Sequence, residues 1–198
     1  MFVSFEGVDW SGKSTQALLL ADWLRGQGRA VLATREPGGT PVAEAVRDLV
    51  LHGDEMAPWT EAALYAAARA EHVAQVIRPA LERGDDVICD RYLDSSVAYQ
   101  GGGRGLGEAR VRELSLTVTG GLLPDRTFLL LLDPETAVRR SGGDHDRIER
   151  SGGAFMHAVD HAYRVLAAGE PDRVVPVDGD RDPDQIAGEI REHVRRLL

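Results

Sequence analysis

A glycine loop near the N-terminus constrains the fold of this chain more than any other feature. The loop, GVDWSGKS over residues 7–14, follows a short apolar, β-prone segment at 2–5 and precedes a segment with apolar residues at helical spacing over 14–25. Glycines allow backbone dihedrals that aim successive N–H groups inward, and the following helix directs the positive end of its dipole at the enclosed group. The pattern therefore predicts a strand, a polyphosphate-binding loop and a helix in direct succession.

The positive charge in this loop is unusual for the chain. Lys13 is the single lysine among 23 basic residues, the others all being arginine. A compact ammonium group fits a narrow loop around phosphates, where the wider guanidinium fork would not. Lys13 is predicted to reach the β- and γ-phosphates of a nucleotide, and Ser14 to offer its hydroxyl to magnesium. The residues predicted to bind the nucleotide are Gly7, Val8, Asp9, Trp10, Ser11, Gly12, Lys13, Ser14 and Thr15.

Apolar strand segments alternate with amphipathic helical segments along the rest of the chain. Such alternation predicts parallel βαβ units, and hence an α/β fold in which a parallel sheet of about five strands is flanked by helices on both faces. The length of 198 residues favours a single domain, 1–198. Strands are expected at 2–5, 30–34, 87–90, 127–132 and 173–177, and helices at 14–25, 40–51, 60–83, 108–119, from 134 onward and at 183–198.

Three local features carry further expectations. Thr60 is a candidate N-cap for the long helix, and Pro79 a possible kink within it. The glycine-rich segment 101–107 is expected to be a connector. The segment 141–153, SGGDHDRIERSGG, has four glycines, few apolar residues and charges of both signs. It is interpreted as a lid, with a passive surface loop as the alternative.

The charge of the chain limits its partners. With 32 acidic and 23 basic residues the net charge is −9, so neither nucleic acid nor an anionic membrane is expected to bind. The longest apolar run, 128–132, is far shorter than the roughly 20 residues of a membrane helix. The N-terminus has no basic segment followed by an apolar one, and a cytoplasmic protein is expected. Cys89, the one cysteine, is expected in the core rather than as a reactive thiol.

Several classes of phosphate-loop protein fit this chain poorly. A regulatory GTPase reads guanine with an Asn-Lys-x-Asp element, yet the only lysine is Lys13. A mechanical ATPase would place a glutamate after a strand-end aspartate, but Asp90 is followed by Arg91, and Asp133 by proline. A small-molecule kinase needs anion clamps for its acceptor and a lid that excludes water. Arginines after the second and third strands, and the segment 141–153, favour that class.

Five segments together resemble the bacterial thymidylate kinases across nearly the whole chain. They are FEGVDWSGKSTQ from Phe5, TREPGGT from Thr34, AAARAEH from Ala66, DRYLDSSVAYQG from Asp90 and DRIE from Asp146. The resemblance implies a P-loop NTPase fold with a five-stranded parallel core. It also implies transfer of the γ-phosphoryl group of ATP to dTMP, giving dTDP and ADP, with Mg²⁺ as cofactor and with a homodimer as the assembly.

The resemblance assigns residues to the acceptor phosphate and sugar. Arg91 is expected to pair with the acceptor phosphate, with a surface salt bridge as the alternative. Arg47 resembles a second phosphate contact, although a charge on a helix surface explains it nearly as well. Tyr99 resembles the tyrosine whose ring leaves no space for a ribose 2′-hydroxyl, and Glu36, in TREPGGT, is also expected at the substrate.

Other residues are assigned to the base. Tyr65 and Arg69 lie four apart and therefore share a helix face. The resemblance implies that Tyr65, where phenylalanine is commoner, stacks on thymine and that Arg69 bonds a base carbonyl; the alternative is an aromatic ring packed in the core. Ser96 matches a small polar contact to the base, and Gln100 is a weaker candidate nearby.

Ser14 and Asp90 are the expected magnesium ligands. The residues alone do not decide between Asp90 and Asp133, whereas the family pattern favours Asp90. Asp9 suits either the metal or the acceptor sugar. A metal cluster at 144–146 is disfavoured, because a glycine-rich acidic segment is more often a solvated loop.

Lys13 and Arg91 are expected to be catalytic, with help from the lid. Some relatives carry a basic residue where this chain has Trp10, so here the additional charge must come from the lid. Arg147, within DRIE, and Arg139 are the chosen candidates, and the chain also offers Arg140 and Arg150.

Two alternatives stay open. A kinase for another acceptor, such as a deoxynucleoside or dUMP, is favoured if Tyr65, Arg69 and Tyr99 do not line one pocket. A regulatory protein that binds ATP without turnover is the alternative outside the enzymes. Lys13, Ser14, Asp90 and Arg91 are all present, which argues against it.

Overall fold

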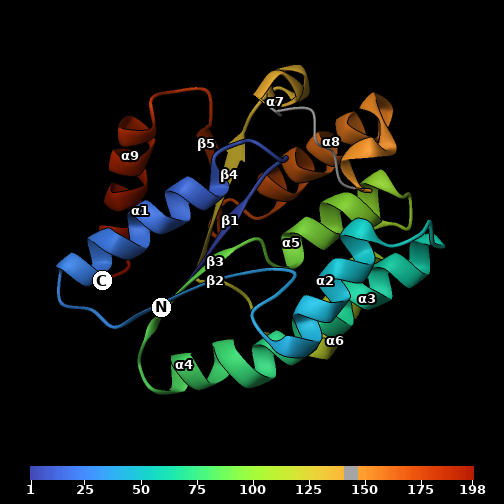
Figure 1. Ribbon diagram of the computed structural model, residues 1–198. Helices are drawn as coiled ribbons and strands as arrows, with labels where there is room; N and C mark the ends of the chain where they lie inside the picture. The colour runs from blue at the N-terminus through green and yellow to red at the C-terminus, as the bar shows by residue number, and fades with distance from the viewer. Residues whose placement is uncertain (141–146) are drawn as a thin grey trace.

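The computed structural model describes residues 1–140 and 147–198. Within them five strands form one sheet in the order β2-β3-β1-β4-β5, and every pairing is parallel. The α/β architecture with a five-stranded parallel sheet is therefore confirmed (Figure 1). The strands are β1 (Phe2–Glu6), β2 (Val31–Arg35), β3 (Asp86–Asp90), β4 (Arg126–Leu131) and β5 (Val174–Asp178).

Helices cover both faces of the sheet. On one face, α1 (Lys13–Gly26) and α9 (Pro183–Arg195) pack on β1, β3 and β4 through residues such as Leu20 and Ile190. On the other face lie η1 (Val73–Ile77), α4 (Arg78–Glu82), α5 (Leu93–Ser96), η2 (Val97–Gly103) and α8 (Gly153–Gly169). The remaining helical segments are α2 (Pro41–His52), α3 (Pro58–His72), α6 (Glu108–Thr119), α7 (Pro134–Arg140) and η3 (Glu149–Ser151).

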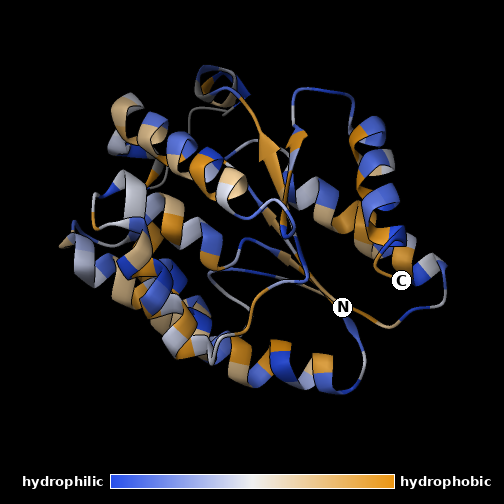
Figure 2. Cartoon of the chain, turned by 180° about the vertical axis from the view of Figure 1, so that it is seen from behind, coloured by the Kyte–Doolittle hydropathy of each residue, from blue (hydrophilic) through white to orange (hydrophobic). Residues whose placement is uncertain are grey.

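The strands are apolar because parallel strands are buried on both faces. Figure 2 shows hydrophobic strands at the centre of the molecule, between helices in which hydrophobic and hydrophilic residues are mixed. Cys89 of β3 is fully buried, as expected, and burial raises the pKa of its thiol well above the ordinary value. In the described part of the chain, no helix is both long enough and apolar enough to cross a membrane.

The long helix expected over residues 60–83 differs in its start and in its middle. It begins at Pro58 with Ala57 as the cap residue, so Thr60 is not the N-cap. Proline suits the first helical position because its missing N–H would have no partner there. At residues 73–77 the α-helix widens into a π-helical turn. Pro79 follows two residues later and cannot donate to the carbonyl four residues back, which explains an irregular turn at this point.

The glycine-rich segment 101–107 is only partly a connector. Gly101–Gly103 continue the helical segment η2 against α8. A Cβ atom added to Gly102 would lie 2.6 Å from the Cβ of Ala162, and one added to Gly103 would lie 2.5 Å from Cε2 of Phe155. These glycines therefore let α8 approach η2 closely. Of the segment 141–153, residues 141–146 lie outside the described residues, including the disfavoured metal cluster at 144–146.

Candidate active site

The loop between β1 and α1 has the backbone that a phosphate-binding loop requires. Gly7 (φ 136°) and Gly12 (φ 96°) adopt positive φ, and a Cβ on Gly7 would collide with the carbonyl oxygen of Leu130. Lys13 is buried, and its Nζ donates to the carbonyl oxygen of Val8 at 2.7 Å, across the loop. Burial and the nearby Arg91 lower the pKa of Lys13 to about 8.

A polar pocket opens over this loop. Trp10 lies in its wall, 48% exposed. Trp10 (φ 65°) and Arg91 (φ 68°) are the two non-glycine residues with positive φ among those described, and both line this pocket. Strained backbone of this kind is concentrated at functional sites. We call this the donor pocket; its lining residues are Asp9, Trp10, Gly12, Lys13, Ser14, Thr15, Arg35, Glu36, Arg47, Asp90, Arg91 and Arg140.

Two oxygen ligands meet at the start of α1. The hydroxyl of Ser14 donates to the carboxylate of Asp90, at the end of the neighbouring strand β3. The other carboxylate oxygen, Oδ1 of Asp90, is buried and has no hydrogen-bond partner among the described residues. Mg²⁺ prefers hard oxygen ligands of this kind, so the pair fits such an ion. Asp133 instead accepts from the backbone N–H of Thr136 at 3.0 Å, at the start of α7.

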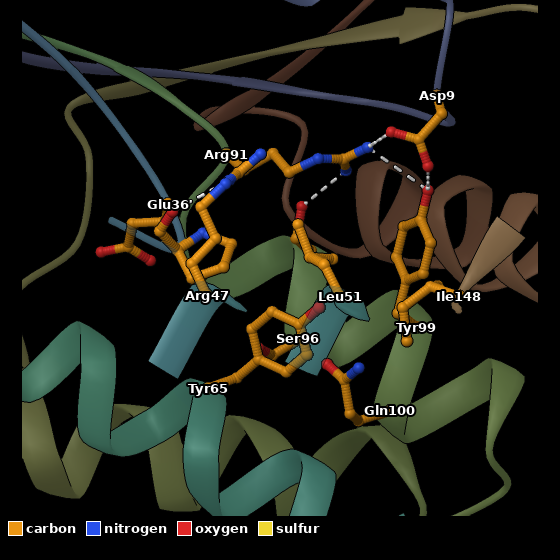
Figure 3. Close-up of a pocket in the computed structure, with 12 residues that line it drawn as sticks. Asp9, Glu36, Arg47, Leu51, Tyr65, Arg91, Ser96, Tyr99, Gln100 and Ile148 are labelled. Carbon is orange, nitrogen blue, oxygen red and sulfur yellow. Dashed lines mark hydrogen bonds and ion pairs between the residues drawn. The ribbon is translucent and has the colours of Figure 1, made fainter. Parts of the chain in front are cut away.

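A second pocket adjoins the first and contains most of the residues expected at the acceptor (Figure 3). Tyr65 from α3 lies in its wall and not in the core, and Tyr99 and Gln100 come from η2. We call this the acceptor pocket; its lining residues are Asp9, Glu36, Pro37, Arg47, Leu51, Tyr65, Arg91, Ser95, Ser96, Tyr99, Gln100 and Ile148.

Arg69 lies behind this lining. It is buried, and its guanidinium donates to Glu36 at 2.7 Å and to Ser96 at 3.1 Å. Its planar group also lies over the ring of Tyr92, 5.5 Å from the centroid. Arg69 thus holds two pocket residues in place, whereas Tyr65 and Tyr99 line the pocket directly.

Arg91 and Asp9 occupy the boundary between the pockets. Arg91 forms an ion pair with Asp9 and donates to the carbonyl oxygen of Gly7 at 3.0 Å. The hydroxyl of Tyr99 donates to the other oxygen of Asp9 at 3.1 Å, and Arg91 lies over the Tyr99 ring, 5.2 Å from its centroid. Burial favours a raised pKa for Asp9, but Arg91 and Lys13 outweigh it and lower the pKa to about 2. The carboxylate is therefore ionised.

Glu6, the last residue of β1, lies beside these residues although it was not among the predicted site residues. Its buried carboxylate accepts from the backbone N–H of Tyr92 at 2.7 Å and from the hydroxyl of Tyr163 at 2.9 Å, and also from Ser95, which contacts Arg91. Burial and the charge of Asp94 raise the pKa of Glu6 to about 7. A charged residue directly after the β-prone segment 2–5 was the available signal, because an acidic side chain is seldom fully buried without a partner.

The arginines expected over the donor phosphates are not grouped there. Arg147 is 3% exposed; its side chain donates to Glu61 at 2.7 Å and to the carbonyl oxygen of Val50 at 2.9 Å, away from the donor pocket. Arg139 is exposed on α7 and donates to Thr136 at 2.6 Å. Arg140 lines the donor pocket and pairs with Asp180 at 2.6 Å. The structure therefore brings Arg140, and neither Arg139 nor Arg147, to the donor side.

A glycine loop after the first strand of a parallel sheet, opening on a donor pocket that adjoins a second pocket lined by polar and apolar residues, defines a P-loop nucleotide kinase. The family model of thymidylate kinases matches residues 5–190. The chain belongs to the thymidylate kinase family, and it is accordingly an enzyme of the kinase class.

Individual relatives agree over the full chain. The thymidylate kinase of Leifsonia xyli subsp. xyli is 56% identical over 196 residues, covering 96% of this chain and 92% of the relative. That of Bifidobacterium longum subsp. infantis is 49% identical over 203 residues, covering 100% and 87%. The crystal structure of thymidylate kinase from Ehrlichia chaffeensis is 32% identical, with a TM-score of 0.82 over 98% of each chain. The P-loop fold is thereby confirmed.

Proposed function

We propose that this kinase transfers the γ-phosphoryl group of Mg-ATP to dTMP, giving dTDP and ADP. One observation carries the proposal: the donor and acceptor pockets share a wall made by Asp9, Glu36, Arg47 and Arg91. A nucleotide held by the phosphate loop and a nucleoside monophosphate held beside Arg91 would meet at this wall. Phosphoryl transfer depends on such positioning and on charge stabilisation more than on covalent chemistry from the protein.

On the donor side, the backbone of residues 7–15 encloses the ATP phosphates and Lys13 neutralises them. Ser14 and Asp90 would hold Mg²⁺, which when bound supplies positive charge to the phosphate oxygens. Arg140 lines the same pocket and replaces Arg147 as our candidate for the additional positive charge.

On the acceptor side, Arg91 holds the dTMP phosphate, assisted by Arg47, which donates to the carbonyl oxygen of Pro37 at 2.9 Å. Tyr65 stacks on the thymine ring, while Ser96 and Gln100 contact its edge. Tyr99, buried beside Asp9, leaves no room for a ribose 2′-hydroxyl. Arg69 serves this side by positioning Glu36 and Ser96.

The assembly and location are further parts of the proposal. We propose a cytoplasmic single-domain enzyme, with residues 141–153 as its lid, that forms a homodimer. Apolar side chains exposed on α2 support the homodimer: Val42 is 56% exposed and Leu49 47%. Light scattering tests the dimer, and a monomer at micromolar concentration would contradict it.

The activity is tested by ADP release with Mg-ATP and each of dTMP, dUMP, UMP, dCMP and thymidine, with products identified by chromatography. We expect dTMP to be preferred and dTDP to form, and Lys13→Ala to abolish release. Preference for another acceptor would reject the proposed substrate but keep the kinase class. Nucleotide binding without any turnover would reject the kinase activity.

A further inference from the structure

A buried carboxylate lies directly beneath the acceptor pocket and takes no part in the reaction proposed above. Glu61 of α3 is 1% exposed and lies behind the pocket lining. Its oxygens accept from Nε2 of Gln100 at 2.8 Å, from Nε and Nη2 of Arg104 at 3.1 and 3.0 Å, and from Nη2 of Arg147 at 2.7 Å. Burial favours a raised pKa, but these donors outweigh it and lower the pKa of Glu61, which is therefore ionised.

An ionised carboxylate fixes which end of a neighbouring amide faces it. Because Glu61 can only accept hydrogen bonds, Gln100 must present its NH₂ group to it, and the carbonyl oxygen of Gln100 faces the other way. Gln100 is 2% exposed and lines the acceptor pocket. Figure 3 shows its amide pointing up into the pocket, with the oxygen on the side of Tyr65 and Ser96. The pocket therefore presents a hydrogen-bond acceptor at this point.

Glu61 also holds one wall of the same pocket. Arg147, bound to Glu61, donates from its backbone N–H to the carbonyl oxygen of Leu51 at 3.0 Å. Leu51 and Ile148, the residue after Arg147, both line the acceptor pocket. Ile148 packs in the same apolar cluster as Tyr99. One carboxylate thus sets the orientation of an amide in the pocket and the position of an apolar wall.

We propose that Glu61 is a positioning residue for base selection. By holding Gln100 as an obligate acceptor, it makes the pocket favour bases whose edge carries a ring N–H, thymine and uracil, over cytosine, whose corresponding ring nitrogen is itself an acceptor. Two acceptors facing each other in a buried site leave both unpaired, which strongly disfavours the wrong ligand. The proposal rests on the proposed function in one respect, that the base occupies this pocket.

The variant Glu61→Gln tests the proposal, because a glutamine at 61 can both donate and accept and leaves the Gln100 amide able to turn over. We expect the ratio of kcat/KM for dTMP to that for dCMP to fall by about tenfold or more. The change should lie in the KM for the monophosphate, with the KM for ATP unchanged. The matched control is Glu170→Gln, which removes a carboxylate that pairs with Arg173 and Arg112 away from both pockets. The control should keep the wild-type ratio.

Measuring the effect of Glu61→Gln in the Gln100→Met variant separates a positioning role of Glu61 from a general loosening of the fold. Gln100→Met has a side chain of similar length without the amide. If Glu61 acts through Gln100, adding Glu61→Gln to Gln100→Met should leave the dTMP-to-dCMP ratio of the single Gln100 variant unchanged. An equal fall in the ratio in both backgrounds would overturn the proposal.

Two further experiments show whether an effect of Glu61→Gln arises from lost folding or from lost activity. Glu61→Gln leaves Arg104 and Arg147 without a counter-charge. If this single variant fails to fold, the double variant Glu61→Gln with Arg104→Leu is measured in its place, because it restores the net charge of the cluster. Equilibrium binding of dTMP, dUMP and dCMP without ATP makes the result independent of turnover. The role of Glu61 is supported if the wild type binds dTMP and dUMP more tightly than dCMP and the variant loses this preference. That conclusion holds even if no dTDP forms, because the absence of dTDP would refute only the proposed function. Equal binding of all three by wild type would overturn the proposal.

Discussion

Arg91 and Asp9 form an ion pair that joins the end of β3 to the phosphate loop, in the wall shared by the two pockets. The pair keeps Arg91 fixed although its own backbone adopts an unfavourable positive φ. A charge held in place before substrate arrives needs little reorganisation during the reaction.

Replacing Arg91 should therefore harm the acceptor side most. We expect Arg91→Ala to lower kcat/KM for dTMP by about 10³ while changing the KM for ATP much less. Arg91→Lys should recover only part of the loss. The guanidinium group of arginine can bind Asp9 and a phosphate at once through its several N–H groups, whereas the ammonium group of lysine is a compact point charge. Steady-state kinetics with each substrate varied in turn checks this. A raised KM for ATP with unchanged use of dTMP would contradict the assignment.

Activity should depend on pH through Lys13. Burial and Arg91 lower its pKa from 10.5 to about 8, so the phosphate-binding ammonium form is present below that pH and is lost above it. We expect kcat/KM for ATP, which reports the free enzyme, to fall as pH rises through 8, approaching about tenfold per pH unit. Lys13→Arg keeps its positive charge over this pH range. Its kcat/KM for ATP should therefore not fall as pH rises through 8, whatever the residual rate of the variant. A wild-type kcat/KM for ATP that stays constant up to pH 10 would contradict the lowered pKa of Lys13.

Asp90 should control the requirement for magnesium. Its Oδ2 accepts from the hydroxyl of Ser14, and its Oδ1 has no hydrogen-bond partner among the described residues. We expect Asp90→Asn to raise the Mg²⁺ concentration for half-maximal activity by about 10- to 100-fold, and chelation by EDTA to abolish the wild-type activity. Asp133→Asn, which alters the start of α7, is the control and should leave the Mg²⁺ titration unchanged. The reverse pattern would assign the metal to Asp133.

Two glycines should respond oppositely to alanine. Gly102→Ala places a methyl group 2.6 Å from the Cβ of Ala162, so α8 must shift, and we expect a loss of about 1–3 kcal/mol in the free energy of unfolding. Gly188, within α9, has no atom within 4 Å of an added Cβ. Gly188→Ala should gain about 0.5–1 kcal/mol, because glycine is entropically costly in a helix. Urea unfolding checks both, and equal effects would refute the packing argument.

Much of the fold followed from local patterns. Strands expected at 127–132 and 87–90 lie at Arg126–Leu131 and Asp86–Asp90, because burial on both faces demands a short continuous apolar run. Local patterns were less informative where contacts with a distant part of the chain determine the conformation of a segment. Gly101–Gly103 resembled a connector, but they belong to η2, where Gly102 and Gly103 pack closely against α8, more than 50 residues later. The strand order likewise depends on crossovers that no single segment encodes.

The sequence by itself determined the phosphate loop, with Lys13 and Ser14 at the start of a helix, because one contiguous segment contains both the glycines and the charges that such a loop requires. Only the tertiary structure placed Asp90, and not Asp133, beside Ser14, and turned Arg147 away from the donor pocket toward Glu61, 86 residues distant. An arginine side chain is long and reaches in several directions. Its role therefore depends on which buried carboxylate the folded chain places beside it, because a buried charge is stable only with a partner.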